Sequence, residues 1–94
     1  MNKLKLYIVG QKPNTVKAIH NLRKLLKERL RDSYSLQVID LLENPQLAEE
    51  EMILATPTLV RSVPPPVRRI VGDLNDAEKV LIELGLVDRK KSAS

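Results

Sequence analysis

The order of apolar and polar residues changes its period twice in the first half of the chain. From Lys3 to Val9, leucine and isoleucine occupy every second position, which predicts a strand that ends at Gly10. Apolar residues then recur at steps of three and four, which predicts an amphipathic helix from about Thr15 to Arg31. Asn14 or Thr15 is the expected N-cap, because a short polar side chain can accept a hydrogen bond from the first helical turn.

The segment from Tyr34 to Leu42 contains β-branched residues and alternates between apolar and polar side chains, which predicts a second strand. Because a helix separates the two strands, we expect them to pair in parallel as a βαβ unit. Asn44 and Pro45 then have the character of an N-cap and a first helical residue, so a short helix is predicted over residues 46–54.

Two further short strands are predicted after this helix. They span Leu59 to Val63 and residues 67–73, and three prolines join them as in a hairpin. A chain of 94 residues has room for one modest core. We therefore expect a single domain over residues 1–88 and a disordered basic tail over residues 89–94.

Residues 80–87 fit two patterns at once. Their apolar side chains alternate as in a strand, and they also line one face of a helix. Asn75 or Asp76 is a candidate cap for that helix, and Gly85 suits its end. Local sequence leaves the strand and the helix close to balanced.

Composition narrows the chemistry of the chain. The absence of cysteine excludes disulfides, thiolate nucleophiles and cysteine-ligated zinc, and it suits a reducing cytoplasm. Lys3 and Lys5 interrupt the first apolar stretch, which therefore lacks the apolar core of a signal peptide, and no segment is long enough to span a bilayer. We expect a cytoplasmic protein that does not bind a membrane.

The chain is basic, with a formal net charge of +4. Such a charge suits nucleic acid, an anionic membrane or an acidic protein surface, and charge alone does not choose among them. Binding of single-stranded nucleic acid uses stacking on aromatic rings, whereas this chain has only Tyr7 and Tyr34. Nucleic acid is therefore the weaker alternative, and the basic face of the long helix is interpreted as solvated.

No pattern of catalytic or metal-binding residues emerges from the sequence. The three glycines are too far apart for a phosphate-binding loop, and His20 has no partner at the spacing of metal ligands. Nothing in the sequence places Asp40, Asp73 or Asp76 in a cleft beside a nucleophile, and Asp73 and Asp76 are more simply turn and cap residues. The acidic run 49–51 is interpreted as a solvated helix face, and we expect no cofactor, no metal and no enzymatic activity.

Three segments resemble the KaiB circadian-clock proteins: Leu4–Ala18, Asn44–Val60 and Val63–Leu84. The KaiB-like sensor domain of the SasA histidine kinase is the second candidate. The resemblance implies an α/β, thioredoxin-like KaiB fold without redox cysteines. It also implies a metamorphic chain, in which a tetrameric ground state of order βαββααβ exchanges with a monomeric, thioredoxin-like state of order βαβαββα.

The same resemblance implies a non-enzymatic clock protein whose thioredoxin-like state binds the N-terminal ATPase ring of KaiC and helps control the KaiC phosphorylation cycle. KaiA and histidine kinases of the SasA or CikA type are further candidate partners, together with copies of this chain. The positions that correspond to the KaiC-contacting face are Lys17, Met52, Arg61 and Arg68.

Several positions depart from the cyanobacterial pattern. Ser35 and Gln37 replace an alanine and a lysine of the KaiA-contacting strand, which makes KaiA capture doubtful. Pro57 falls where a thioredoxin-like fold has a cis-proline, and Glu83 and Gly85 replace residues that shift the balance between the two folds. The alternative functions are an interaction module in a KaiC-linked stress response without KaiA, an enzyme remnant with Thr15 in place of a redox cysteine, and a nucleic-acid binder.

Overall fold

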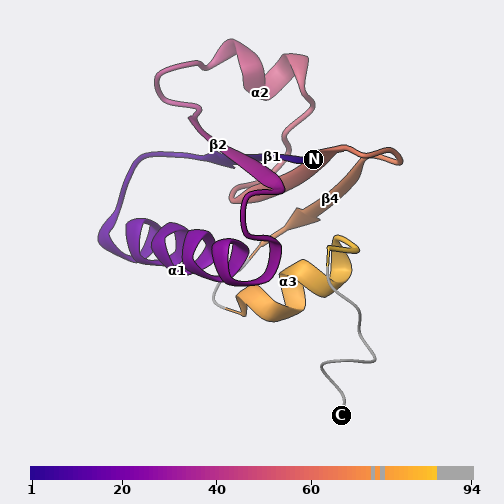
Figure 1. Ribbon diagram of the computed structural model, residues 1–94. Coiled ribbons are helices and arrows are strands. Elements are labelled where there is room, and N and C mark those ends of the chain that lie inside the picture. The colour runs from indigo at the N-terminus through magenta and orange to yellow at the C-terminus, as the bar shows by residue number, and fades with distance from the viewer. Residues whose placement is uncertain (73, 75, 87–94) are drawn as a thin grey trace.

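A four-stranded sheet separates two layers of helices (Figure 1). The computed structural model describes residues 1–72, 74 and 76–86, and the predicted tail at 89–94 lies outside this part of the chain. The elements in chain order are β1 (Asn2–Ile8), α1 (Pro13–Leu30), β2 (Tyr34–Asp40), α2 (Gln46–Glu50), β3 (Thr58–Val63), β4 (Arg68–Val71) and α3 (Ala77–Glu83). This is the predicted thioredoxin-like order, so the fold class is confirmed. The second order, with a strand at the end, stays a prediction.

The sheet has the strand order β2-β1-β3-β4. As predicted for a βαβ unit, β1 pairs in parallel with β2, with Leu4 opposite Leu36. Strand β3 runs antiparallel to β1, and β4 runs antiparallel to β3 as the second arm of a hairpin. Strands β2 and β4 therefore form the two edges.

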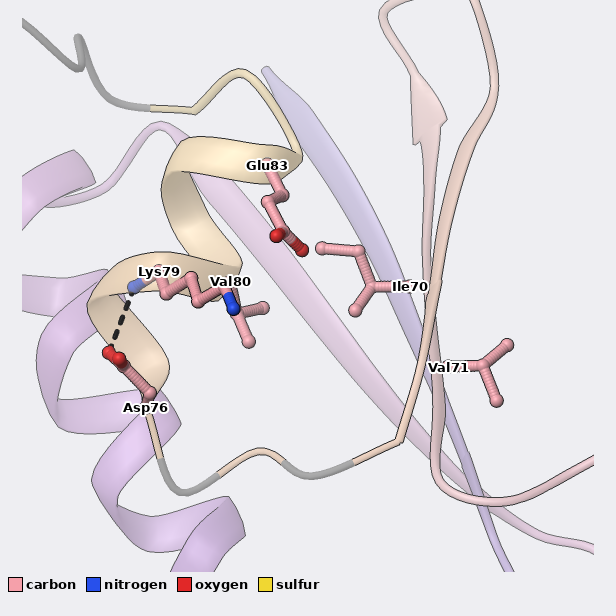
Figure 2. Close-up of a pocket in the computed structure, with 6 residues that line it drawn as sticks. All are labelled: Ile70, Val71, Asp76, Lys79, Val80 and Glu83. Atoms are coloured by element: carbon pink, nitrogen blue, oxygen red, sulfur yellow. Dashed lines mark hydrogen bonds between the residues drawn. The ribbon is translucent and has the colours of Figure 1, made fainter.

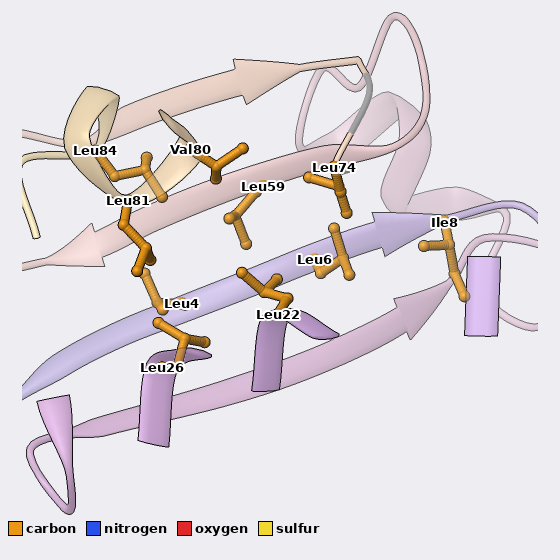
Figure 3. Close-up of a cluster of buried hydrophobic side chains, with 10 residues drawn as sticks. All are labelled: Leu4, Leu6, Ile8, Leu22, Leu26, Leu59, Leu74, Val80, Leu81 and Leu84. Atoms are coloured by element: carbon orange, nitrogen blue, oxygen red, sulfur yellow. The ribbon is translucent and has the colours of Figure 1, made fainter. Parts of the chain in front are cut away.

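Alternate residues of the central strands divide between two cores. On the side of α1 and α3, Leu6 of β1 and Leu59 of β3 belong to a large cluster that also includes buried leucines of both helices (Figure 3). On the opposite side, Tyr7 and Val60 pack with Ile53 in a smaller cluster beneath α2. Because successive side chains of a strand point to opposite faces, neighbouring residues of β1 and β3 serve different helices.

Helix α1 begins earlier than predicted. It starts at Pro13, with Lys12 in the N-cap position and no side-chain cap, so neither Asn14 nor Thr15 caps it. Proline suits the first helical position because its φ is already set and its missing N–H would have no helical partner there. The helix ends at Leu30 instead of Arg31, which has a positive φ of 54°.

Helix α2 is shorter than predicted, and Asn44 is not its N-cap. Pro45 occupies that position, while the side-chain amide of Asn44 donates to the Asp40 carbonyl at 3.4 Å. The helix ends at Glu50 because Met52 takes a positive φ of 53° and turns the chain toward β3. Strand β2 likewise ends at Asp40, before the predicted Leu42, because the Asp40 carboxylate accepts hydrogen bonds from the backbone N–H groups of Gly10 and Leu42.

The ambiguous C-terminal segment is helical up to Glu83. Asp76 caps α3 by accepting a hydrogen bond from the Lys79 N–H at 3.1 Å, as one of the two candidate caps predicted. Gly85 follows the helix with a φ of +73°. The other candidate cap, Asn75, and the last residue of the ambiguous segment, Val87, lie outside the described residues.

Candidate functional site

The turn that ends α2 exposes two large apolar side chains. Met52 is 70% exposed and Leu54 is 93% exposed, whereas Ile53 between them is buried in the smaller core. Two backbone N–H groups of this turn are hydrogen-bonded to α2, since the Met52 N–H donates to the Glu49 carbonyl and the Ile53 N–H donates to the Ala48 carbonyl at 2.8 Å. The turn therefore has a defined shape while its two flanking side chains face solvent.

Arg69 of β4 holds this turn from the neighbouring layer. Its guanidinium donates to the carbonyl oxygens of Glu51 at 2.8 Å and of Met52 at 3.2 Å. These carbonyls stand at the C-terminal end of α2, where a positive charge is favourable. We call Met52, Leu54 and Arg69 the Met52 surface.

Tyr7 lies beneath the same turn, in the smaller core. Burial raises the pKa of Tyr7 above its ordinary value of 10.0. The nearby Glu51 carboxylate raises this pKa further, and the Arg69 guanidinium opposes the shift. The side chain beneath the Met52 surface, Tyr7, therefore stays neutral to a higher pH than an ordinary tyrosine.

The predicted partner residues do not form one surface. Met52 is on the α2 side of the sheet, whereas Lys17 is exposed on α1, on the other side (Figure 1). Arg61 and Arg68 are opposite one another on β3 and β4, and both reach the end of α3. Arg68 is exposed, but Arg61 is only 7% exposed, so its guanidinium serves contacts within the chain.

The predicted KaiA-contacting residues Ser35 and Gln37 are exposed on edge strand β2. Their register partners on β1 are Lys3 and Lys5, respectively. The Thr56–Pro57 peptide bond is cis, and Glu83 and Gly85 lie at the end of α3.

Sequence reasoning missed Arg69 and Leu54. The adjacent arginines 68 and 69 of a predicted strand must point to opposite faces, and this alternation was the available signal for Arg69. For Leu54 there was no such signal, because the predicted helix 46–54 included it, and its exposure follows from the earlier end of α2.

A hollow of about 190 Å³ lies where β1 leads into α1. Thr15 lines it together with Pro57 and Lys12, and the remaining lining residues are apolar or threonine. A threonine hydroxyl needs an adjacent base to act as a nucleophile. Lys12 is the one ionisable side chain among the residues that line this hollow, and no hydrogen bond joins it to the Thr15 hydroxyl within the described part of the chain.

A second hollow, of about 340 Å³, lies between β4 and α3, and Figure 2 shows its lining. Ile70 and Val80 contribute apolar surface, and Asp76, Lys79 and Glu83 contribute charge. The Asp76 carboxylate accepts a hydrogen bond from the Lys79 backbone N–H. This hollow is therefore a partly charged groove beside edge strand β4.

The remaining candidate residues for catalysis or metal binding are an exposed histidine and two aspartates. His20 is exposed on α1, and Asp40 is engaged by two backbone N–H groups, while Asp73 lies outside the described residues. Within residues 1–72, 74 and 76–86, no group of three or more histidine, aspartate or glutamate side chains is placed to hold a metal ion. In the same part of the chain, no helix has the length and apolar character needed to cross a membrane.

Comparison with known sequences identifies the family. A KaiB domain model matches residues 5–86. The circadian clock oscillator protein KaiB of Microcystis aeruginosa is 58% identical over 84 residues, which cover 89% of this chain and 81% of that protein. The KaiB protein of Prochlorococcus marinus strain SARG is 55% identical over 91 residues, which cover 97% of this chain and 78% of the relative.

Solved structures extend the comparison to the fold. The N-terminal domain of Synechococcus elongatus SasA superposes with a TM-score of 0.71 at 27% identity, covering 93% of this chain and 86% of that domain. Mitochondrial thioredoxin 3 of Saccharomyces cerevisiae has a TM-score of 0.66 at 20% identity, covering 88% of this chain and 78% of that protein, and it shows the fold alone. The resemblance predicted from three sequence segments is confirmed, and the chain belongs to the KaiB family.

Proposed function

We propose that this chain is a non-enzymatic clock protein that binds the N-terminal ATPase ring of a KaiC-type protein through its thioredoxin-like state. By this association it helps control the KaiC phosphorylation cycle. Membership of a family whose curated relatives are named circadian clock oscillator proteins supports the role. The observation that carries the proposal is the Met52 surface, which presents apolar side chains on an ordered turn.

Two features of this turn raise the free energy of the unbound folded chain. Met52 adopts a left-handed backbone conformation, which costs a non-glycine residue about 1–2 kcal/mol. Leu54 leaves nearly its whole side chain in water, although burial of a leucine contributes about 1.5–3 kcal/mol. Unfavourable conformations and exposed apolar groups that persist on an ordered turn are typical of binding sites.

Arg69 makes this surface ready for association. Because its guanidinium fixes the Glu51 and Met52 carbonyls, the turn has little conformational freedom left to lose when a partner binds. Arg69 also supplies positive charge beside the apolar side chains, which suits carboxylates on the partner.

The proposal leaves KaiA out and contains no catalytic step. Ser35 and Gln37 replace the alanine and lysine that the family resemblance assigns to the KaiA-contacting strand. The hollow beside Thr15 is lined by neither a carboxylate nor a histidine.

The test is co-elution of the chain with a cognate KaiC-type ring in the presence of nucleotide, after incubation from minutes to a day. Leu54→Glu should weaken the association at least about tenfold, because it removes the leucine burial and places a charge in the contact. The matched control is Val16→Glu, which adds the same charge at a residue 48% exposed on α1, across the sheet. Equal binding by Leu54→Glu and Val16→Glu would remove the Met52 surface from the proposal, and no binding by the wild-type chain would refute the proposal itself.

A further inference from the structure

The C-terminal end of α3 takes part of its hydrogen bonding from another part of the chain. A helix leaves its last four carbonyl groups without helical partners. Two of them are satisfied locally, since the Leu86 N–H donates to Leu81 and the Gly85 N–H donates to Ile82, both at 2.9 Å. The carbonyls of Glu83 and Leu84 remain.

Arginines of the β3–β4 hairpin donate to these two carbonyls. Arg61 Nη1 donates to the Leu84 oxygen at 2.6 Å, and Arg68 Nη1 reaches the Glu83 oxygen at 3.5 Å. The helix has no basic residue in its own last turn, so the hairpin supplies the positive charge that its C-terminal end favours. Arg61 makes the stronger contact, because its bond is shorter and its side chain is buried.

Arg61 also ties this helix end to the proline turn of the hairpin. Its Nη2 group donates to the Pro66 carbonyl at 3.1 Å, so one guanidinium joins the β3–β4 turn to the end of α3. Its Nε–H is buried and has no partner within the described part of the chain. A buried cation held only by backbone carbonyls loses its compensation if either side moves away.

The sequence of α3 does not favour a helix strongly by itself. The apolar residues from Val80 onward fit a strand as well as a helix, and α3 has only seven residues, Ala77–Glu83. Helices of this length are not stable in isolation, so tertiary contacts decide. We propose that α3 stays helical only while the Arg61 guanidinium joins its C-terminal end to the β3–β4 hairpin. We call these hydrogen bonds, from Arg61 to Leu84 and Pro66, the latch. The inference goes beyond the proposed function, since it concerns the free chain and requires no ring.

Gly85 belongs to the same latch. A Cβ atom at Gly85 would stand 3.1 Å from Arg61 Nη1 and 3.7 Å from Arg68 Nη1. The glycine therefore provides the positive φ of the helix end and also the space through which the Arg61 guanidinium reaches the Leu84 carbonyl. A side chain at position 85 and the loss of the Arg61 guanidinium should therefore disturb the same contact, the hydrogen bond from Arg61 Nη1 to the Leu84 carbonyl.

Amide hydrogen exchange of the free chain tests the latch, with β1 amides as the report on global unfolding. Arg61→Lys keeps the charge but loses the two-armed fork, and it should speed exchange of α3 amides about ten- to a hundredfold, with β1 changed far less. Arg68→Lys is the matched control, because it makes the same change at the neighbouring arginine and also keeps the charge. It should change α3 exchange by less than about threefold because the bond it removes is long and exposed. Unchanged α3 exchange in Arg61→Lys, or an equal acceleration in α3 and β1, would overturn the inference.

A double-mutant cycle gives a second, independent readout of the contact between Arg61 and the end of α3. Gly85→Ala should accelerate α3 exchange about tenfold in the wild-type background. The same substitution should have a clearly smaller effect in the Arg61→Lys background, because the Nη1 group that Cβ approaches is gone. Additive effects of the two substitutions would contradict the assigned contact.

Discussion

Replacement of Met52 by glycine should make the folded chain more stable and should lower its affinity for the proposed KaiC-type ring. Met52 has a positive φ of 53°, and 70% of it is exposed, so the folded chain gains little from the side chain. Glycine adopts this backbone conformation without steric cost. The substitution therefore separates the conformational cost of the turn from the use of its side chain.

The magnitude follows from two opposing effects. Relief of the left-handed conformation gives about 1–2 kcal/mol, while the greater freedom of glycine in the unfolded chain takes back about 0.5–1 kcal/mol. The expected net gain is about 0.5–1 kcal/mol, which corresponds to a rise in Tm of about 2–8 °C for a domain of this size. Affinity for the ring should fall about tenfold, because most of a buried methionine contact is lost.

Met52→Ala is the matched control. It removes the same side chain but keeps the left-handed cost, so it should weaken ring binding like Met52→Gly without raising stability. Urea unfolding followed by circular dichroism, at one protein concentration for all three chains, measures the difference. The reasoning is refuted if Met52→Gly is no more stable than Met52→Ala.

Two further predictions concern Tyr7 and Asp76. Because the pKa of Tyr7 is raised above 10.0 in the folded chain, the unfolded chain loses this proton first, so the free energy of unfolding should fall as the pH rises from about 10 through the folded pKa. Tyr7→Phe should reduce this fall in urea titrations from pH 8 to 11; a pH profile identical to that of the wild-type chain would contradict the assignment. Asp76→Ala removes the acceptor of the Lys79 N–H and should cost about 1 kcal/mol, whereas Asp76→Asn should retain most of the cap. Equal stability of the alanine and asparagine variants would show that this cap contributes nothing.

The sequence was sufficient where one pattern dominates. The alternation in β1 and the three- and four-residue steps in α1 each match one element, and the helix between two strands required parallel pairing. The predicted start of α1 is wrong by two residues because Pro13, expected in the preceding loop, is the first helical residue.

The remainder depends on contacts between residues far apart in the chain. Whether the segment from Val80 is a strand or a helix was undecided locally, and the structure places the Arg61 guanidinium, 23 residues from Leu84, at the end of the helix. The shape of the Met52 surface likewise depends on Arg69, which is 18 residues from Glu51. Periodicity shows which face a residue occupies but not which carbonyl its side chain reaches. The family resemblance placed Arg61 on a partner face, whereas its side chain is buried.

The most direct test of the account is native mass spectrometry of the wild-type chain mixed with its cognate KaiC-type ring and nucleotide. The account predicts rings that carry this chain after prolonged incubation, and loss of these species with Leu54→Glu but not with Val16→Glu. A wild-type chain that remains unbound to the intact ring at every incubation time would contradict it.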